Sequence, residues 1–133
     1  MPTPSQVSGR RWECLLRRAD FLRVAASGVR RVTPGFILQA AARENSEPGP
    51  LRIGFTASRK VGNAVARNRA KRRLRALSDR VMVEAANPSL DYVFVARTET
   101  VAREFAVMER ELHHALAKMP AVTTARMPKA AAQ

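Results

Sequence analysis

The first half of the chain contains two segments with the hydrophobic spacing of strands. Phe36, Leu38 and Ala40 recur at every second position of residues 36–43, as strands with one buried face require. Leu51, Ile53 and Phe55 do the same in residues 51–58. Residues 44–50, ENSEPGP, are polar and include two prolines, so they predict an exposed turn. The two strands are therefore expected to form a hairpin.

A short helix is predicted before these strands. Apolar residues cluster between positions 15 and 26 with helical spacing. Asp20 is the expected N-cap, because its carboxylate can accept a hydrogen bond from the first helical turn. Gly28 follows the segment, where a helix end favours a residue that accepts positive φ.

The second half of the chain predicts a helix, a strand and a final helix. Residues 62–84 form the longest expected helix, and residues 91–97 are almost continuously apolar, which is typical of a strand covered on both faces. Residues 101–119 place apolar side chains on one helical face, with Thr100 as the expected N-cap. The apolar stripe of the longest helix consists of Ala66, Ala70, Leu74, Leu77 and Val81.

This order of elements predicts an α+β fold, a two-layer sandwich in which helices pack on a small sheet. The expected order is helix, hairpin, helix, strand, helix. We assign residues 13–119 to a single domain, because a chain of 133 residues supports one modest core. Residues 1–12 and 120–133 are expected to be flexible tails.

The net charge points to a polyanionic partner. Lys and Arg number 24 against 11 acidic residues, which gives a formal net charge of +13. Residues 1–80 carry this whole excess, whereas residues 81–133 contain equal numbers of basic and acidic side chains. Such confinement is typical of a nucleic-acid footprint. Aromatic residues make up only 5% of the chain, so contacts to phosphates are expected to dominate over base stacking.

Other features narrow the class of protein. The longest strongly apolar run has five residues, far too few to span a membrane, and residues 1–11 lack the apolar core of a signal peptide. Cys14 is the only cysteine, so neither an internal disulfide nor a Cys-pair zinc site is possible. We therefore expect a soluble cytoplasmic protein with no membrane partner.

One segment concentrates the charge. Eight basic residues and no acidic residue occur from Arg59 to Arg75. Like charges at i and i+4 repel on a helix, and ordinary solvated faces interleave acidic residues to avoid this repulsion. An acid-free face is favourable when RNA phosphates supply the negative charge. The expected stripe, opposite the apolar one, consists of Asn68, Lys71, Arg72 and Arg75.

This segment resembles the ribonuclease P protein component family. The resemblance rests on a long ungapped pattern and extends more weakly over about residues 15–117. The matching residues are Arg52 and Gly54, Arg59-Lys60, Gly62-Asn63-Ala64-Val65 and Arg67-Asn68-Arg69-Ala70-Lys71-Arg72.

The resemblance implies a left-handed crossover from a strand through the basic helix to a parallel strand. It also implies that the protein assists ribonuclease P, an endoribonuclease, by binding the ribonuclease P RNA, one protein per RNA, and the 5′ leader of precursor tRNA. No catalytic residue is expected in this chain. Mg²⁺ held mainly by the RNA would activate the water that cleaves the phosphodiester bond, and the protein itself would bind no metal tightly.

The family's site residues carry over position by position. The expected RNA contacts are Arg59, Lys60, Arg67, Asn68, Arg69, Lys71, Arg72 and Arg75. The leader cleft would be lined by Phe21, with Phe36, Thr56 and Ser58 as weaker candidates. Two positions that are often aromatic in the family are Ala25 and Gln39 here, which reduces the expected stacking on the leader. Phe21 could equally be a core residue that anchors the first helix.

Three other functions compete with this interpretation. A self-sufficient nuclease is disfavoured, because His113 and His114 point about 100° apart on a helix and no carboxylate cluster suits two metals. A ribosomal or other structural RNA-binding protein would show the same charge and much the same fold. A helix-turn-helix DNA-binding protein is disfavoured because a strand, not a partner helix, precedes the basic helix.

Overall fold

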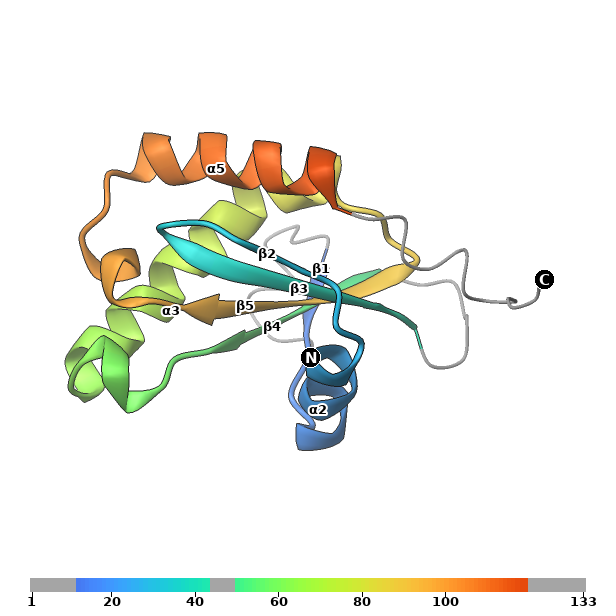
Figure 1. Cartoon of the computed structure of the whole chain (residues 1–133), viewed down its shortest axis with the longest axis horizontal. Coiled ribbons are helices and arrows are strands. Elements are labelled where there is room, and N and C mark those ends of the chain that lie inside the picture. The colour runs from blue at the N-terminus through green and yellow to red at the C-terminus, as the bar shows by residue number, and fades with distance from the viewer. Residues whose placement is uncertain (1–11, 44–49, 120–133) are drawn as a thin grey trace, which may run out of the picture.

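The computed structural model describes residues 12–43 and 50–119, which form a sheet with helices on both faces (Figure 1). The sheet has five strands in the order β1-β4-β5-β3-β2. β5 is the central strand, paired parallel to β4 and antiparallel to β3. The strands are β1 (Trp12–Cys14), β2 (Arg30–Val32), β3 (Phe36–Ala42), β4 (Leu51–Thr56) and β5 (Leu90–Ala96).

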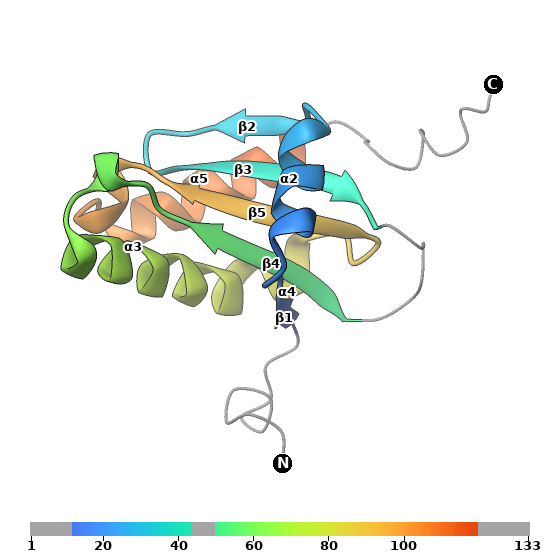
Figure 2. The ribbon, with the colours of Figure 1, turned by 90° about the horizontal axis from the view of Figure 1, so that it is seen from below.

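Three main helices cover the sheet. α3 and α5 lie on one face and α2 crosses the other, as Figures 1 and 2 show. α3 continues through a π-helical turn, η2, into the short helix α4, and two 3₁₀ turns, η1 and η3, flank the sheet. The α+β class is confirmed, but α2 adds a partial third layer to the predicted two. The bounds are α2 (Arg18–Ala26), η1 (Arg59–Val61), α3 (Ala64–Leu77), η2 (Ser78–Met82), α4 (Val83–Ala85), η3 (Thr98–Val101) and α5 (Phe105–Lys118).

The predicted hairpin is wrong. β3 and β4 exist at nearly the predicted positions, but β5 lies between them. The hairpin of this sheet is instead formed by β2 and β3, which pair antiparallel. An alternating pattern identifies the buried face of a strand but not its partner, whereas the nearly continuous apolar run of β5 correctly indicated a strand covered on both faces.

The connection from β4 through α3 to β5 is a left-handed crossover. β4 and β5 are parallel neighbours, and α3 lies behind them in Figure 2, where α2 is nearest the viewer. In Figure 2 both strands point to the left and β5 lies above β4, so turning the picture until the strands point upward puts β5 to the right of β4. Because the connecting helix is on the far side of the sheet, the connection is left-handed. Most such connections are right-handed, so this topology is unusual.

The core lies between the sheet and the face formed by α3 and α5. Most of the predicted stripe is buried there: Ala70, Leu74 and Leu77 of α3 and Val81 of η2 are buried, whereas Ala66 is half-buried. α5 contributes Met108 and Leu112. Edge-to-face contact joins Phe36 and Phe94, whose ring centroids are 5.3 Å apart. A smaller cluster beneath α2 contains Leu15, Val24, Ala41 and Val93.

Helix ends differ from the sequence prediction at two points. Asp20 is not an N-cap, because α2 begins earlier and Arg17 holds that position, so Asp20 lies buried in the first turn. Thr100 is not the N-cap of α5, because it belongs to η3 and Glu104 precedes α5. The expectation for Gly28 is confirmed by its φ of 78°.

The predicted domain begins slightly too late. Trp12, which we assigned to the N-terminal tail, belongs to β1 and donates a hydrogen bond of 2.8 Å from its indole nitrogen to Asp79. Residues 1–11, 44–49 and 120–133 lie outside the described residues, and the predicted tails and turn fall largely within these ranges.

Candidate nucleic-acid interface

The start of α3 is fixed by local hydrogen bonds. The Asn63 side chain caps the helix by accepting a hydrogen bond of 2.9 Å from the backbone of Ala66. Gly62 has a φ of 145°, which side-chain-bearing residues rarely adopt, and separates α3 from η1. In η1, the Ser58 hydroxyl accepts from the backbone of Lys60. The Gly-Asn motif therefore sets the angle between η1 and the basic helix.

The exposed side of η1 and α3 carries a basic surface. Arg59 and Lys60 are exposed on η1, while Asn68 and Arg72 are exposed on α3 and Lys71 is half-buried. We call these residues the basic surface. None of them forms an ion pair with another described residue, so their charge is not neutralised within this part of the chain.

Arg75 differs from the expectation of a purely solvent-facing stripe. Its guanidinium carbon lies 5.4 Å from the centre of the Phe55 ring, in cation–π geometry. The Phe55 ring also stacks on Phe94 at 5.8 Å. Arg75 therefore contributes to packing as well as to the charge of α3, and its replacement would disturb the edge of the core.

Two further predicted RNA contacts bind the protein's own backbone. Arg67 donates from Nη1 to the carbonyl oxygen of Gly62 at 2.9 Å, and Arg69 donates from Nε to that of Val101 at 3.2 Å. Each guanidinium keeps further N–H groups that can donate to phosphate. Arg73, which we did not assign from the sequence, is half-buried and uses its guanidinium in the same way.

Phe21 packs directly on the sheet beside the expected leader cleft. A Cβ atom at Gly54 would lie only 2.7 Å from the Phe21 ring, so the glycine makes room for it. Phe21 is nevertheless half-buried, and part of its ring remains accessible. Thr56 is exposed on the same face, two residues along β4, and Ser58 is exposed just beyond the strand.

Phe36 cannot line this cleft. Its side chain is fully buried, and Phe94, which it meets edge to face, lies in the core with α3 and α5. β3 residues on the other face belong to the cluster beneath α2, as Ala41 does. Phe36 was one of the weaker candidates for the cleft that the resemblance suggested, and that prediction is wrong.

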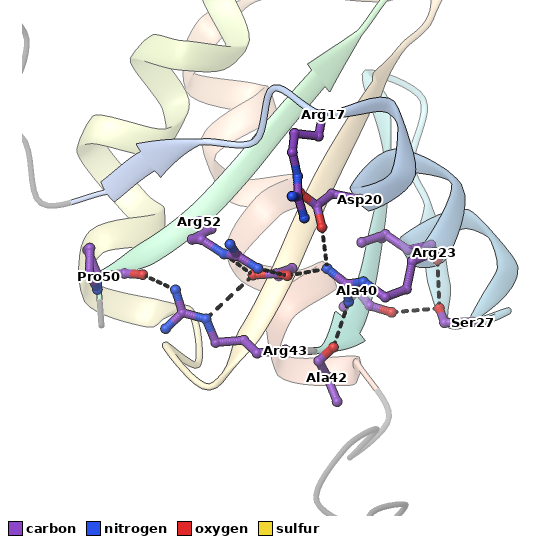
Figure 3. Close-up of polar contacts among 11 residues, drawn as sticks. Arg17, Asp20, Arg23, Ser27, Ala40, Ala42, Arg43, Pro50 and Arg52 are labelled. Carbon is purple, nitrogen blue, oxygen red and sulfur yellow. Dashed lines mark hydrogen bonds and ion pairs between the residues drawn. The ribbon is translucent and has the colours of Figure 1, made fainter. Parts of the chain in front are cut away.

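A network of arginines and two buried carboxylates holds α2 against the sheet (Figure 3). Asp91 is fully buried and accepts hydrogen bonds from Arg23 at 2.5 Å and from two nitrogens of Arg52 at 2.6 and 2.9 Å. Arg43 lies 3.6 Å away. The network therefore links α2, β4, β5 and the end of β3 at one point.

Asp20 forms the second carboxylate of this network. Burial alone would raise its pKa, but hydrogen bonding from Arg23 and the charge of Arg17 outweigh burial, so the pKa is lowered. The ionised carboxylate thus stabilises the fold above the pKa of an unfolded aspartate. That contribution disappears as the pH falls through the lowered value.

The histidines and other possible metal ligands of the described ranges are not gathered in a metal-binding cluster. His113 and His114 are both exposed on α5, as predicted. Across residues 12–43 and 50–119, no three His, Cys, Asp or Glu side chains lie together in a way that could hold a metal ion. No helix in these ranges is long and apolar enough to cross a membrane.

Comparisons with known proteins point to one family. A family model described as ribonuclease P matches residues 10–120. The ribonuclease P protein component of Paramagnetospirillum magneticum is 45% identical over 114 residues, covering 84% of this chain and 86% of that protein. That of Caulobacter vibrioides is 41% identical over 111 residues, covering 84% and 73%. The solved RNase P protein of Staphylococcus aureus is similar with a TM-score of 0.63 and 25% identity, covering 78% of this chain and 92% of that one.

Proposed function

Since the chain belongs to the ribonuclease P protein component family, we propose that it binds the ribonuclease P RNA through the basic surface and the 5′ leader of precursor tRNA beside α2. The family is the protein part of an endoribonuclease that processes tRNA. Within that enzyme, this chain contributes binding and positioning, with one protein bound to each RNA.

The observation that supports this function is the unneutralised charge on one side of the molecule. The basic surface lies in an acid-free stretch from Arg59 to Arg72. Its side chains come from two adjoining elements, η1 and α3, whose relative angle is fixed by Gly62 and Asn63. A rigid array of guanidinium and ammonium groups matches the phosphates of folded RNA and loses little conformational entropy on binding.

Cleavage itself is assigned to the RNA. Among the described residues, no three His, Cys, Asp or Glu side chains lie together in a way that could hold a metal ion, as metal-assisted cleavage by the protein itself would need. We therefore assign the Mg²⁺ ions, and the water that they activate, to the RNA partner. This chain's residues would supply only positive charge and a surface for the leader.

Reconstitution tests this function. The protein alone should not cleave precursor tRNA, whereas the protein added to ribonuclease P RNA at low Mg²⁺ should accelerate 5′ processing. RNA binding without acceleration would instead favour a structural RNA-binding protein. Metal-dependent cleavage by the RNA-free protein would refute the assignment of catalysis to the RNA.

Arg72→Ala should weaken binding to the ribonuclease P RNA without lowering stability. Arg72 is exposed, and like charges surround it, so its loss should leave folding unchanged or slightly more favourable. Loss of one charge-assisted phosphate contact should cost roughly 1.5–3 kcal/mol of binding free energy. The slope of log affinity against log salt should flatten by about 0.9.

The matched control is Arg110→Ala, which removes the same charge from the exposed surface of α5. It should change neither the affinity nor the slope appreciably. If Arg72→Ala retains both the wild-type affinity and the wild-type slope, the basic surface is merely solvated.

Phe21→Ala should discriminate between a leader contact and a core role. If the accessible part of the ring stacks on a leader base, the variant should lose about 1–3 kcal/mol of affinity for precursor tRNA but not for mature tRNA. Leu22→Ala is the control, because Leu22 is the next residue of α2 and is 55% exposed. An equal loss for both RNAs together with a lower melting temperature would show that Phe21 acts only in the core.

A further inference from the structure

Arg73 makes more backbone contacts than any member of the basic surface. Its Nη1 donates to the carbonyl oxygens of Thr100 at 3.0 Å and Val101 at 3.1 Å, and its Nη2 donates to that of Arg103. The side chain thus spans from the middle of α3 to the segment between β5 and α5. We call residues 97–103 the η3 segment.

The η3 segment is tied to the rest of the fold at several points. Thr100 is fully buried, accepts a hydrogen bond of 2.8 Å from the backbone of Arg97 and donates from its hydroxyl to Gly35. Thr98 donates to the carbonyl oxygen of Lys60 in η1 at 3.5 Å. η1 and η3 lie side by side at the left end of Figures 1 and 2. The segment therefore supports the end of the sheet where η1 and the start of α3 meet.

The positive charge of Arg73 would be unfavourable at this position without the backbone carbonyl groups of the η3 segment. Burial lowers its pKa, and the neighbouring charge of Arg69 lowers it further. Arg73 forms no ion pair within residues 12–43 and 50–119, so its charge is compensated by backbone oxygens. Thr100 and Val101 are the last residues of η3, so their carbonyls lie at the negative end of that short helix. Arg69 donates to the same Val101 oxygen.

We propose that Arg73 is a positioning residue for RNA binding, which fixes the η3 segment against α3 and so holds the cations of η1 and those of α3 in one rigid array. It does so without touching the RNA. This inference rests on the proposed function, because it concerns how the basic surface presents its charges to the ribonuclease P RNA.

The experiment compares Arg73→Met with Arg72→Met over a range of salt concentrations. Methionine keeps an unbranched apolar stem but has neither the N–H donors nor the positive charge, so the hydrogen bonds to the η3 segment are lost. Arg73→Met should lower affinity for the ribonuclease P RNA roughly tenfold, because η1 side chains must then be ordered on binding. The salt slope should stay unchanged. Arg72→Met should lower affinity and also flatten the slope by about 0.9.

Hydrogen exchange supplies the structural readout. The amides of Thr100 and Arg103, which donate to Arg97 and Glu99, should exchange faster in free Arg73→Met than in the wild type. Arg73→Lys is the second variant. It keeps the charge but replaces the planar fork with a single ammonium, and its affinity should fall between those of the wild type and Arg73→Met.

Several outcomes would overturn the inference. Wild-type affinity in Arg73→Met, even with a lower melting temperature, would show a purely structural role, and a slope flattened by about 0.9 would show a direct phosphate contact. If Arg73→Met does not fold, Arg73→Lys provides the test. Wild-type affinity in Arg73→Lys would show that the planar guanidinium group is not needed to position the basic surface. Failure of the wild type to bind the ribonuclease P RNA would instead refute the proposed function.

Discussion

Asp91→Ala should lower the free energy of unfolding by roughly 3–5 kcal/mol, because it leaves partly buried arginines without their shared counter-ion. Asp91 is fully buried, and its carboxylate receives N–H groups from Arg23 and Arg52. Arg43, whose side chain is 8% exposed, lies beside them. Urea denaturation followed by circular dichroism measures the loss.

Glu84→Ala is the control for this prediction. Glu84 is an exposed acidic residue of α4, and its removal should change stability by no more than about 0.5 kcal/mol. Asp91→Asn keeps the shape and one acceptor but removes the charge, so it should also destabilise the protein. A loss below about 1 kcal/mol in Asp91→Ala would show that water compensates the arginines and that the network does not hold α2 in place.

The network also explains why Arg52 and Gly54 belong to the family pattern, which the sequence alone could not explain. Arg52 and Gly54 are two residues apart on β4, so both face α2. Arg52 binds Asp91, and Gly54 leaves space for the Phe21 ring. Arg52 therefore holds α2 in place through the charged network, and Gly54 lets α2 pack closely on β4 because it has no side chain.

The sequence predicted most helices and strands but not their arrangement. The alternation of apolar residues in β3 and β4 identified the buried face of each strand. The same alternation occurs whether the two strands pair in a hairpin or lie on either side of a third strand. The strand β1 was missed because three residues are too few to show a period, and β2 was missed for the same reason. Helix spacing was more informative because α3 and α5 each span 14 residues.

The candidate site was predicted to different extents on the two faces of the sheet. The basic surface followed from charge and helical spacing within one continuous segment. The leader cleft needs residues from separate elements, and the sequence does not state which face of β3 lies under α2, so Phe36 was assigned wrongly. Arg73 belonged to an all-basic run, and nothing in that run distinguishes an arginine that binds backbone from one that faces solvent.

Leu74→Ala should lower the free energy of unfolding by roughly 2–5 kcal/mol through loss of packing and formation of a cavity. Leu74 is fully buried on α3, between the helix and the sheet. Val65→Ala is the control on the same helix, because Val65 is 76% exposed and its truncation should change stability by no more than about 0.5 kcal/mol. Both can be measured by urea denaturation.

The same variant tests whether the two faces of α3 act independently. At a temperature where Leu74→Ala remains folded, its salt slope for binding ribonuclease P RNA should match that of the wild type, because every phosphate-facing cation is retained. Arg72→Ala should show the reverse pattern, with unchanged stability and a flatter slope. If Leu74→Ala flattens the slope while still folded, core packing controls which cations reach the phosphates. The basic surface would then depend on the core beneath it as well as on the hydrogen bonds of Asn63 and Arg73.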